Sequence, residues 1–216
     1  SEENANDILC LIDYWNTMLD HEHVNDTKNN LAALNVNKYA TLDAKLVELI
    51  EYTIDLSTSY KVVNPLYGTL KDLWELPTEN ECLTQIEVSL STRVAINDND
   101  VHLLGDGLID LDYIKKGFIG EKIKEYLISK GIDRYVINYN ADLVLYGKNK
   151  NGGSFETSFY GMKNGTYNLS DITLARVTAD NNCFYTKDGR RWADIPSFVT
   201  GVPNDTFETL FVLGDD

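Results

Sequence analysis

GDGLIDLDYIKKGFIGEKIKEYLISKGIDRYVINYNADLVLYG, residues 105–147, carries the strongest secondary-structure signals of the chain. It predicts a short strand from Leu108 to Leu111, then a helix, then two strands on either side of an Asn-rich turn. Asp112 is expected to cap the helix, because a short acceptor side chain can bind backbone N–H groups of the first turn. The unit is typical of a core scaffold.

The predicted helix carries an apolar stripe and a clear end signal. Its apolar residues recur at the spacing of one helix face: Ile119, Ile123, Tyr126 and Leu127. Gly131 stands where a left-handed residue ends a helix, and the alternating segment 135–139 after it predicts a strand. Lys116 and Gly117 lie near the expected helix start, where a lysine beside free N–H groups is a suitable cradle for a phosphate or cofactor.

Several segments of the chain are similar to sequence motifs of one protein family. DLDYIKKGF (110–118) resembles the D-L-G-G-I-A-K-G-Y motif of the FAD:protein FMN transferase (flavin transferase, ApbE) family. NYNAD (138–142), followed by Gly147, resembles the N-L-G-G-D…G turn of that family. NPLYGTLKDLW (64–74) is similar to D-P-T-V-G-P-L-V-N-L-W, and TAD (178–180) stands where the family has a T-S-G turn.

The resemblance covers about residues 8 to 214 and implies a fold and a ligand. The expected fold is α+β, a single ApbE-like domain over residues 1–216 with a mixed or antiparallel sheet and packed helices. The expected substrate is FAD. The residues that match flavin-binding positions are Lys116, Gly117, Asn64, Asn140, Asp142 and Thr178.

The C-terminal segment DTFETLFVLG (205–214) suggests a metal site. If the segment begins as a helix, Asp205 and Thr209 lie four residues apart on one face, where a carboxylate and a hydroxyl can bind one Mg²⁺. The segment resembles the D-A-L-S-T-A-L-F-V-L-G of the family, whose aspartate and threonine bind the metal. The resemblance also implies a third ligand, the backbone carbonyl of Lys115.

The activity that the resemblance implies is magnesium-dependent transfer of FMN from FAD to a serine or threonine of an acceptor flavoprotein, with release of AMP. Asp205 and Lys116 are the expected catalytic residues. Phosphoryl transfer of this kind depends on positioning and charge neutralisation. The family further implies an extracytoplasmic protein, a lipoprotein tethered to a membrane by an anchor outside this chain.

The sequence departs from the family at functional positions, which keeps two alternatives open. Asp112-Tyr113 and Asn140-Ala141 replace the two G-G pairs of the family, Asn64 replaces its aspartate, and its H-I-I-D-P-x-T-G loop is not recognisable. These departures favour a non-catalytic flavin-binding or scaffold relative. A sugar-binding or surface-ligand domain is a third hypothesis, suggested by the 13 tyrosines and the many acidic groups.

Composition limits the classes of partner. The 216-residue chain is 43% hydrophobic, so it can bury a substantial core, and its formal charge of −15 argues against nucleic-acid binding. No apolar run approaches the roughly 20 residues of a membrane span. The isolated cysteines predict buried thiols, and His21 and His23 are expected at the surface.

The remaining elements follow from local patterns. A helix is expected from Asn6 or Asp7, a loop over 20–30, and a second helix capped by Thr41. Further expectations are a capping box at 78–81, a hairpin over 93–104 and late strands at 158–162, 172–178 and 183–186.

We expect Asp205→Ala to abolish magnesium-dependent behaviour, because the substitution removes the only charged ligand of the predicted site. FAD binding and AMP release, each measured with and without Mg²⁺, check this expectation. Unchanged metal dependence in the variant would remove Asp205 from the metal site.

Overall fold

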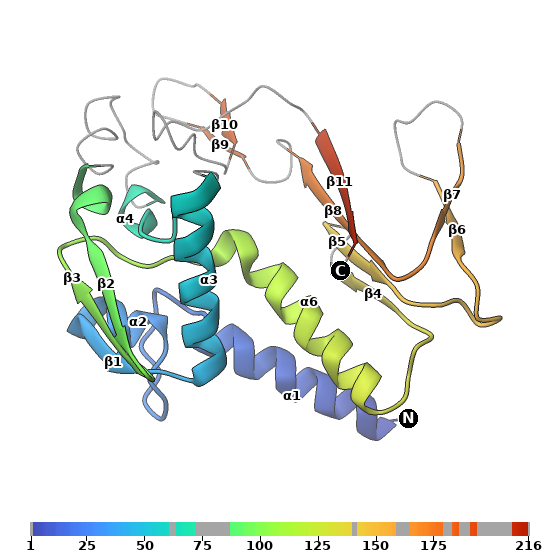
Figure 1. The fold of residues 1–216 in the computed structure, drawn as a ribbon, viewed down its shortest axis with the longest axis horizontal. Coiled ribbons are helices and arrows are strands. Elements are labelled where there is room, and N and C mark those ends of the chain that lie inside the picture. The colour runs from blue at the N-terminus through green and yellow to red at the C-terminus, as the bar shows by residue number, and fades with distance from the viewer. Residues whose placement is uncertain are drawn as a thin grey trace. The chain divides into compact units, whose positions relative to one another are not determined.

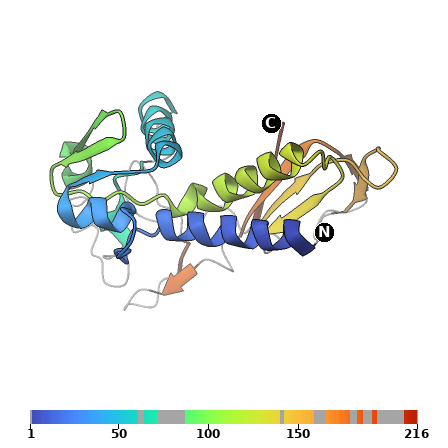
Figure 2. The same cartoon turned by 90° about the horizontal axis from the view of Figure 1, so that it is seen from below.

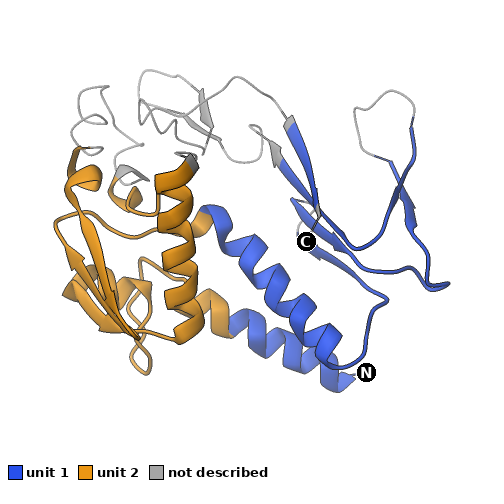
Figure 3. Ribbon diagram, viewed as in Figure 1, with its two compact units in different colours: residues 1–13, 113–178, 209–216 blue, residues 14–112, 179–208 orange. Residues whose placement is uncertain are grey.

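The computed structural model describes residues 2–60, 64–71, 87–139, 142–158, 165–178, 183–185, 191–193 and 209–215. These residues form α helices and antiparallel sheets, which confirms the expected α+β class (Figure 1). The chain divides into two compact units, residues 1–13, 113–178 and 209–216, and residues 14–112 and 179–208 (Figure 3). Whether 1–216 acts as one domain stays a prediction.

The elements up to β3 belong mainly to the second of these units. They are α1 (Glu2–Met18), α2 (Leu31–Asn37), β1 (Tyr39–Thr41), α3 (Ala44–Tyr60), α4 (Gly68–Lys71), a helical segment at 87–91, β2 (Arg93–Asn97) and β3 (Asp100–Leu104). β2 and β3 form the predicted hairpin, and β1 pairs with the other edge of β3. β9 (Cys183–Tyr185) and β10 (Arg191–Ala193) form a separate antiparallel pair.

The core of this unit is built from the apolar faces of α1, α2, α3 and β3. Its members are almost fully buried: Trp15, Met18, Leu19, Leu31, Leu34, Leu46, Ile50, Val101, Leu103, Ile109 and Leu111. The two long helices expected in this part of the chain, α1 and α3, are therefore present. The helix start predicted at Thr41 is wrong, because Thr41 lies in β1 and the Asp43 carboxylate accepts the Lys45 backbone N–H instead.

The other unit contains α6 (Asp112–Ser129), β4 (Val136–Tyr139), β5 (Leu143–Tyr146), β6 (Phe155–Thr157), β7 (Tyr167–Leu169), β8 (Ile172–Thr178) and β11 (Thr209–Asp215). Four of these strands form an antiparallel sheet in the order β11-β8-β5-β4, and β6 pairs with β7. β4 and β5 are the two strands predicted around the Asn-rich turn. The first part of α1 runs beside α6 (Figure 2), and the Tyr126 hydroxyl donates to the Asp7 carboxylate at 2.7 Å.

Helix α6 packs its predicted stripe against this sheet. Ile119, Ile123 and Leu127 are buried, and Gly120 permits a close approach, because a Cβ there would lie 2.9 Å from a Leu145 methyl carbon. Gly131 ends the helix with φ of 72°, as predicted. Its N–H donates to the Ile128 carbonyl and the next N–H donates to the Leu127 carbonyl, which is the hydrogen-bond pattern of a Schellman motif.

The predicted strand from Leu108 to Leu111 is wrong. Leu108 makes only an isolated parallel bridge with Tyr67, and residues 109–111 have no regular structure. The reason is a side chain: the Asn35 amide accepts the Ile109 N–H at 2.8 Å and donates to the Ile109 carbonyl at 2.9 Å. Asn35 therefore binds the backbone N–H and C=O groups of Ile109 that would otherwise pair with a neighbouring strand.

Some predicted elements lie in segments outside the described residues. The capping box at 78–81 and nearly all of the strand expected at 158–162 lie outside the described residues, whereas β8 and β9 confirm the later strands. Cys10 is exposed, so the buried thiol predicted there is wrong. No helix of the described residues is long and apolar enough to cross a membrane.

We expect Asn35→Leu to lower the free energy of unfolding by about 2–5 kcal/mol. The substitution keeps the branched shape of the side chain but leaves the buried N–H and C=O of Ile109 unpaired, and each buried unsatisfied group costs about 1–3 kcal/mol. Urea unfolding measures the loss. Asn37→Leu, at an exposed position of the same helix, is the control, and an equal small effect in both variants would contradict the assignment.

Candidate functional site

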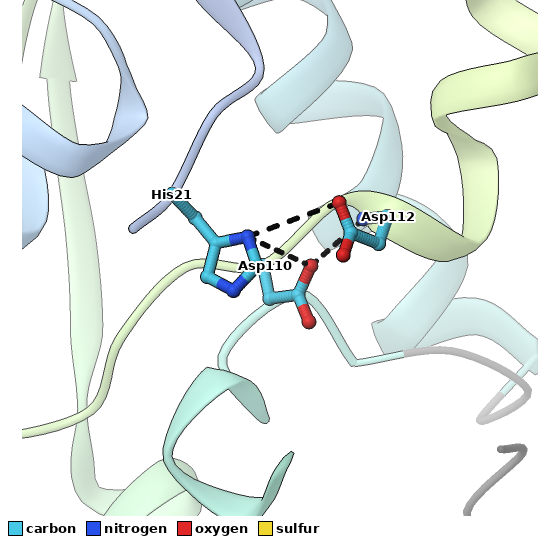
Figure 4. A group of neighbouring side chains, drawn as sticks. All are labelled: His21, Asp110 and Asp112. Carbon is cyan, nitrogen blue, oxygen red and sulfur yellow. Dashed lines mark hydrogen bonds and ion pairs between the residues drawn. The ribbon is translucent and has the colours of Figure 1, made fainter. Parts of the chain in front are cut away.

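Three side chains gather at one end of the segment that leads into α6. The His21 Nδ1 atom lies 3.6 Å from a carboxylate oxygen of Asp110 and 3.8 Å from one of Asp112 (Figure 4). One ligand atom from each residue lies within 4.8 Å of the other two. Asp110 is buried, the His21 side chain is 13% exposed and the Asp112 side chain is 41% exposed. The cluster is therefore partly open to solvent.

Buried amides hold the backbone of this cluster. Besides its two bonds to Ile109, Asn35 donates to the His21 carbonyl at 3.4 Å. Asn30 caps α2 by accepting the Ala33 N–H and donates to the His23 carbonyl. The loop that carries His21 is thus tied to the segment before α6.

Asp110 also starts helix α6. Its carboxylate accepts the Asp112 backbone N–H at 2.8 Å, while its own N–H donates to the Pro65 carbonyl. A negative charge at this position is favourable, because the first turn of a helix presents unpaired N–H groups and the positive end of the helix dipole. Asp110 therefore contributes to the helix start that was predicted for Asp112.

The expectation that His21 is a surface residue is wrong, whereas His23 is exposed as expected, with 79% of its side chain accessible. The two carboxylates that face the His21 Nδ1 come from Asp110 and Asp112, far from it in sequence. The one local signal is the Asp-x-Asp spacing before the helix. That signal indicates two neighbouring carboxylates but does not identify the histidine.

A second cluster lies in the other unit, around Asp142. The Lys116 Nζ donates to one carboxylate oxygen of Asp142 at 2.8 Å, and an Arg176 Nη atom donates to the other at 3.2 Å. The Arg176 backbone N–H also donates to the Asp142 carbonyl at 2.7 Å. The structure therefore brings together Lys116 and Asp142, two residues predicted for flavin binding, and adds Arg176, which the sequence reasoning missed.

The charges around Asp142 decide its protonation. Partial burial acts to raise the pKa of Asp142, but the hydrogen bonds and positive charges of Lys116 and Arg176 outweigh it and hold the pKa below its usual value of 3.8. The Asp142 side chain is 19% exposed and that of Lys116 is 41% exposed. The Arg176 Nε atom is buried and has no hydrogen-bond partner among the described residues. The Asp142 carboxylate is thus held between two cations, and each cation has further N–H donors that do not bond Asp142.

Lys115, Lys116 and Gly117 lie within α6. Because the helix begins at Asp112, Lys115 is in its first turn and Lys116 and Gly117 follow. The free N–H groups of the helix thus precede Lys116, so Lys116 can offer its ammonium group to an anion. A Cβ at Gly117 would meet no described atom within 4 Å, so packing does not require a glycine there.

Asn64 lies at an open pocket of about 360 Å³ in the second unit. Its side-chain oxygen accepts the Leu66 N–H at 3.0 Å, and Ser57, Thr58 and Arg93 are among the other lining residues. The pocket offers hydroxyl, amide and guanidinium groups beside apolar surface. Such a lining suits a polar ring or a ribose.

For the remaining predicted residues, the structure describes either the backbone only or nothing. Asn140 and Asp205 lie outside the described residues. Thr178 and Thr209 are directly opposite partners in the β8–β11 pair. Thr209 begins strand β11, so it does not lie on the helix face predicted for it. The donor set of Asp205, Thr209 and the Lys115 carbonyl consists of oxygens, which Mg²⁺ prefers, and the assignment of these ligands stays a prediction.

Comparison with known proteins identifies relatives for almost the whole chain. The sequence model of the ApbE family matches residues 12–214. A search of curated proteins found no match.

Solved structures share the fold at low identity. The crystal structure of the flavinyl transferase ApbE from Pseudomonas stutzeri, in its apo form, is 13% identical with a TM-score of 0.81, over 99% of this chain and 71% of that chain. The ApbE protein from Thermotoga maritima is 16% identical with a TM-score of 0.84, over 100% and 74%. The flavin transferase ApbE from Vibrio cholerae is 17% identical with a TM-score of 0.75, over 99% and 74%.

We expect the stability difference between the protein and its Asp142→Asn variant to depend on pH in a defined window. A carboxyl whose folded pKa is depressed stabilises the fold above its unfolded pKa, and the contribution is lost as pH falls through the folded pKa. The difference should therefore be constant from pH 7 to 5 and shrink below pH 3.8. Urea unfolding at several pH values measures it, with Glu156→Gln as an exposed-carboxylate control. A difference that stays constant below pH 3.8 would contradict the Lys116–Asp142–Arg176 assignment.

Proposed function

The chain belongs to the ApbE family, and we propose that it is a flavin transferase that moves FMN from FAD to a serine or threonine hydroxyl of an acceptor protein. The observation that carries the proposal is the contact between Lys116 and Asp142. These residues stand in two segments that resemble motifs of the family, and the two segments are far apart in sequence.

The Asp142 cluster suits the anionic part of such a substrate. FAD carries a pyrophosphate, and phosphate oxygens are acceptors for ammonium and guanidinium groups. Lys116 has three donors, of which one bonds Asp142, and its ammonium group is partly exposed. The Nε donor of Arg176 is buried and finds no partner among the described residues. We infer that Asp142 orients both cations while they bind the phosphates.

Mg²⁺ fits the donor set predicted for it. Asp205, Thr209 and the Lys115 carbonyl would hold the ion with oxygen ligands, and the bound ion would neutralise charge on the transferring phosphoryl group. Thr209 lies opposite Thr178 in the β8–β11 pair, so two predicted site residues begin from neighbouring backbone positions.

The proposed reaction is a displacement at phosphorus. The acceptor hydroxyl oxygen forms a bond to the phosphorus on the FMN side, the bond from that phosphorus to the bridging oxygen breaks, and AMP leaves with the bridging oxygen. The hydroxyl proton is released to solvent. Chemistry of this kind requires positioning and charge compensation more than a protein nucleophile, and Lys116 with Arg176 would supply both.

A non-catalytic flavin-binding relative is the second candidate function. The observation that favours it is the position of Asp112, whose carboxylate stands where the family has a glycine and lies 3.8 Å from the His21 Nδ1. The neighbouring Tyr113 is 45% exposed and adds an aromatic ring at the second glycine position. Both side chains occupy space that glycines would leave to a ligand.

The deciding experiment measures FAD binding and AMP release on the same samples, with and without Mg²⁺, using a peptide that contains a serine or threonine. We expect magnesium-dependent AMP, and a gain in peptide mass that equals FMN. We expect Lys116→Ala to weaken FAD binding about 10-fold or more, because a charge-assisted hydrogen bond contributes about 1.5–3 kcal/mol. Lys130→Ala, with a similarly exposed lysine at the end of the same helix, is the control.

The outcomes separate the candidate functions. AMP without a change in peptide mass would indicate hydrolysis of FAD instead of transfer. FAD binding without AMP would support the non-catalytic relative. If the protein neither binds FAD nor releases AMP, both candidate functions are contradicted. If Lys116→Ala binds FAD as tightly as the unsubstituted protein does, the Asp142 cluster is not part of the FAD site.

A further inference from the structure

His21, Asp110 and Asp112 combine an imidazole nitrogen with two carboxylates in one compact unit. We propose that these three residues bind a divalent cation of the zinc class. None of its side chains belongs to the predicted Mg²⁺ ligands or to the Asp142 cluster.

The ligand types select the class of cation. Imidazole nitrogen is a borderline ligand that suits Zn²⁺ and neighbouring transition metals, whereas Mg²⁺ prefers oxygen ligands alone. One histidine with two carboxylates is a mixed nitrogen and oxygen set, which zinc accepts readily. The His21 cluster therefore favours Zn²⁺ over Mg²⁺.

The distances suit a small cation. With zinc–ligand bonds of about 2.0–2.1 Å, the ligands of a tetrahedral site lie about 3.4 Å from one another. The His21 Nδ1 lies 3.6 Å from Asp110 and 3.8 Å from Asp112, so a slight closure would complete three positions. The partly exposed Asp112 leaves room for water at the fourth, which is the arrangement of an open zinc site.

The surroundings of the imidazole suit ligation through Nδ1. Both aspartates face Nδ1, while Nε2 lies 3.8 Å from a carboxylate oxygen of Glu22 (Figure 4 shows the aspartate side). Ligation by Nδ1 places the ring proton on Nε2, where an outer carboxylate can orient it. At 3.8 Å Glu22 does not hydrogen-bond Nε2, and a small side-chain rotation would bring it within reach of that proton.

The electrostatics and the backbone favour the same conclusion. Asp110 is 4% exposed, and one of its carboxylate oxygens lies within 4.8 Å of one from Asp112. A divalent cation between the two carboxylates would be attracted to both. Asn35 already holds the backbone of His21 and of Ile109, so the site needs little ordering on binding.

The test uses the full chain after treatment with a chelator. We expect calorimetric titration with Zn²⁺ to show one strong site, and Mg²⁺ at the same concentration to leave it unchanged. His21→Ala, Asp110→Asn and Asp112→Asn should each weaken zinc binding by 100-fold or more. His23→Ala and Asp106→Asn are the controls, because both residues are exposed and lie near the cluster in sequence without belonging to it.

The variants are chosen to keep the fold. Asparagine at position 110 can still accept the Asp112 N–H, so the start of α6 retains its hydrogen bond. Circular dichroism checks each variant. If Asp110→Asn does not fold, His21→Ala and Asp112→Asn decide the question, because both residues are more exposed.

Two results would overturn the proposal. Equal zinc affinity in the unsubstituted protein and in a folded His21→Ala variant would mean that the ion binds elsewhere on the acidic surface. A weak site that Mg²⁺ competes for equally would mean ordinary carboxylate binding. Co²⁺ gives an independent measurement on the unsubstituted protein, since a strong visible absorption band indicates the low coordination number expected of a zinc-class site, and its absence would contradict it.

Discussion

The pairing of the Asn35 side chain with the backbone of Ile109 is the interaction on which much of the described structure depends. One amide accepts the Ile109 N–H, donates to the Ile109 carbonyl and also reaches the His21 carbonyl. It replaces a neighbouring strand at the place where the chain passes from β3 to α6. Because Asn35 is buried, these bonds are shielded from competing water, and losing them would leave buried polar groups unpaired.

Two aspartates, Asp110 and Asp142, organise the two clusters of charged side chains. Asp110 accepts the first N–H of α6 and stands beside His21, so one buried charge both starts a helix and belongs to the proposed cation site. Asp142 lies between Lys116 and Arg176 and connects a helix to β8. In a chain with a net charge of −15, local positive charge is scarce, so the two cations gathered at Asp142 mark a place where an anionic ligand is favoured.

Local patterns predicted much of the fold because the relevant forces act between near neighbours in sequence. The stripe of Ile119, Ile123 and Leu127, the left-handed Gly131 and the β2–β3 hairpin all follow from spacing and turn chemistry. The predictions of secondary structure fail where a contact with a residue distant in sequence decides the local conformation. Residues 108–111 have the composition of a strand, yet Asn35 takes the backbone groups of Ile109. Thr209 fits a helical spacing, yet it pairs with Thr178 as the first residue of a strand.

The sequence alone predicted the three long helices, the β2–β3 hairpin, β4, β5, β8 and β9, the α+β class and the family motifs in which Lys116 and Asp142 stand. It did so because amphipathic period, turn residues and motif order are properties of adjacent positions. The fold was needed to show that Lys116 contacts Asp142, that Arg176 joins them, and that His21 meets Asp110 and Asp112. These contacts link segments far apart in the chain, and no local pattern specifies which distant side chain fills a given position.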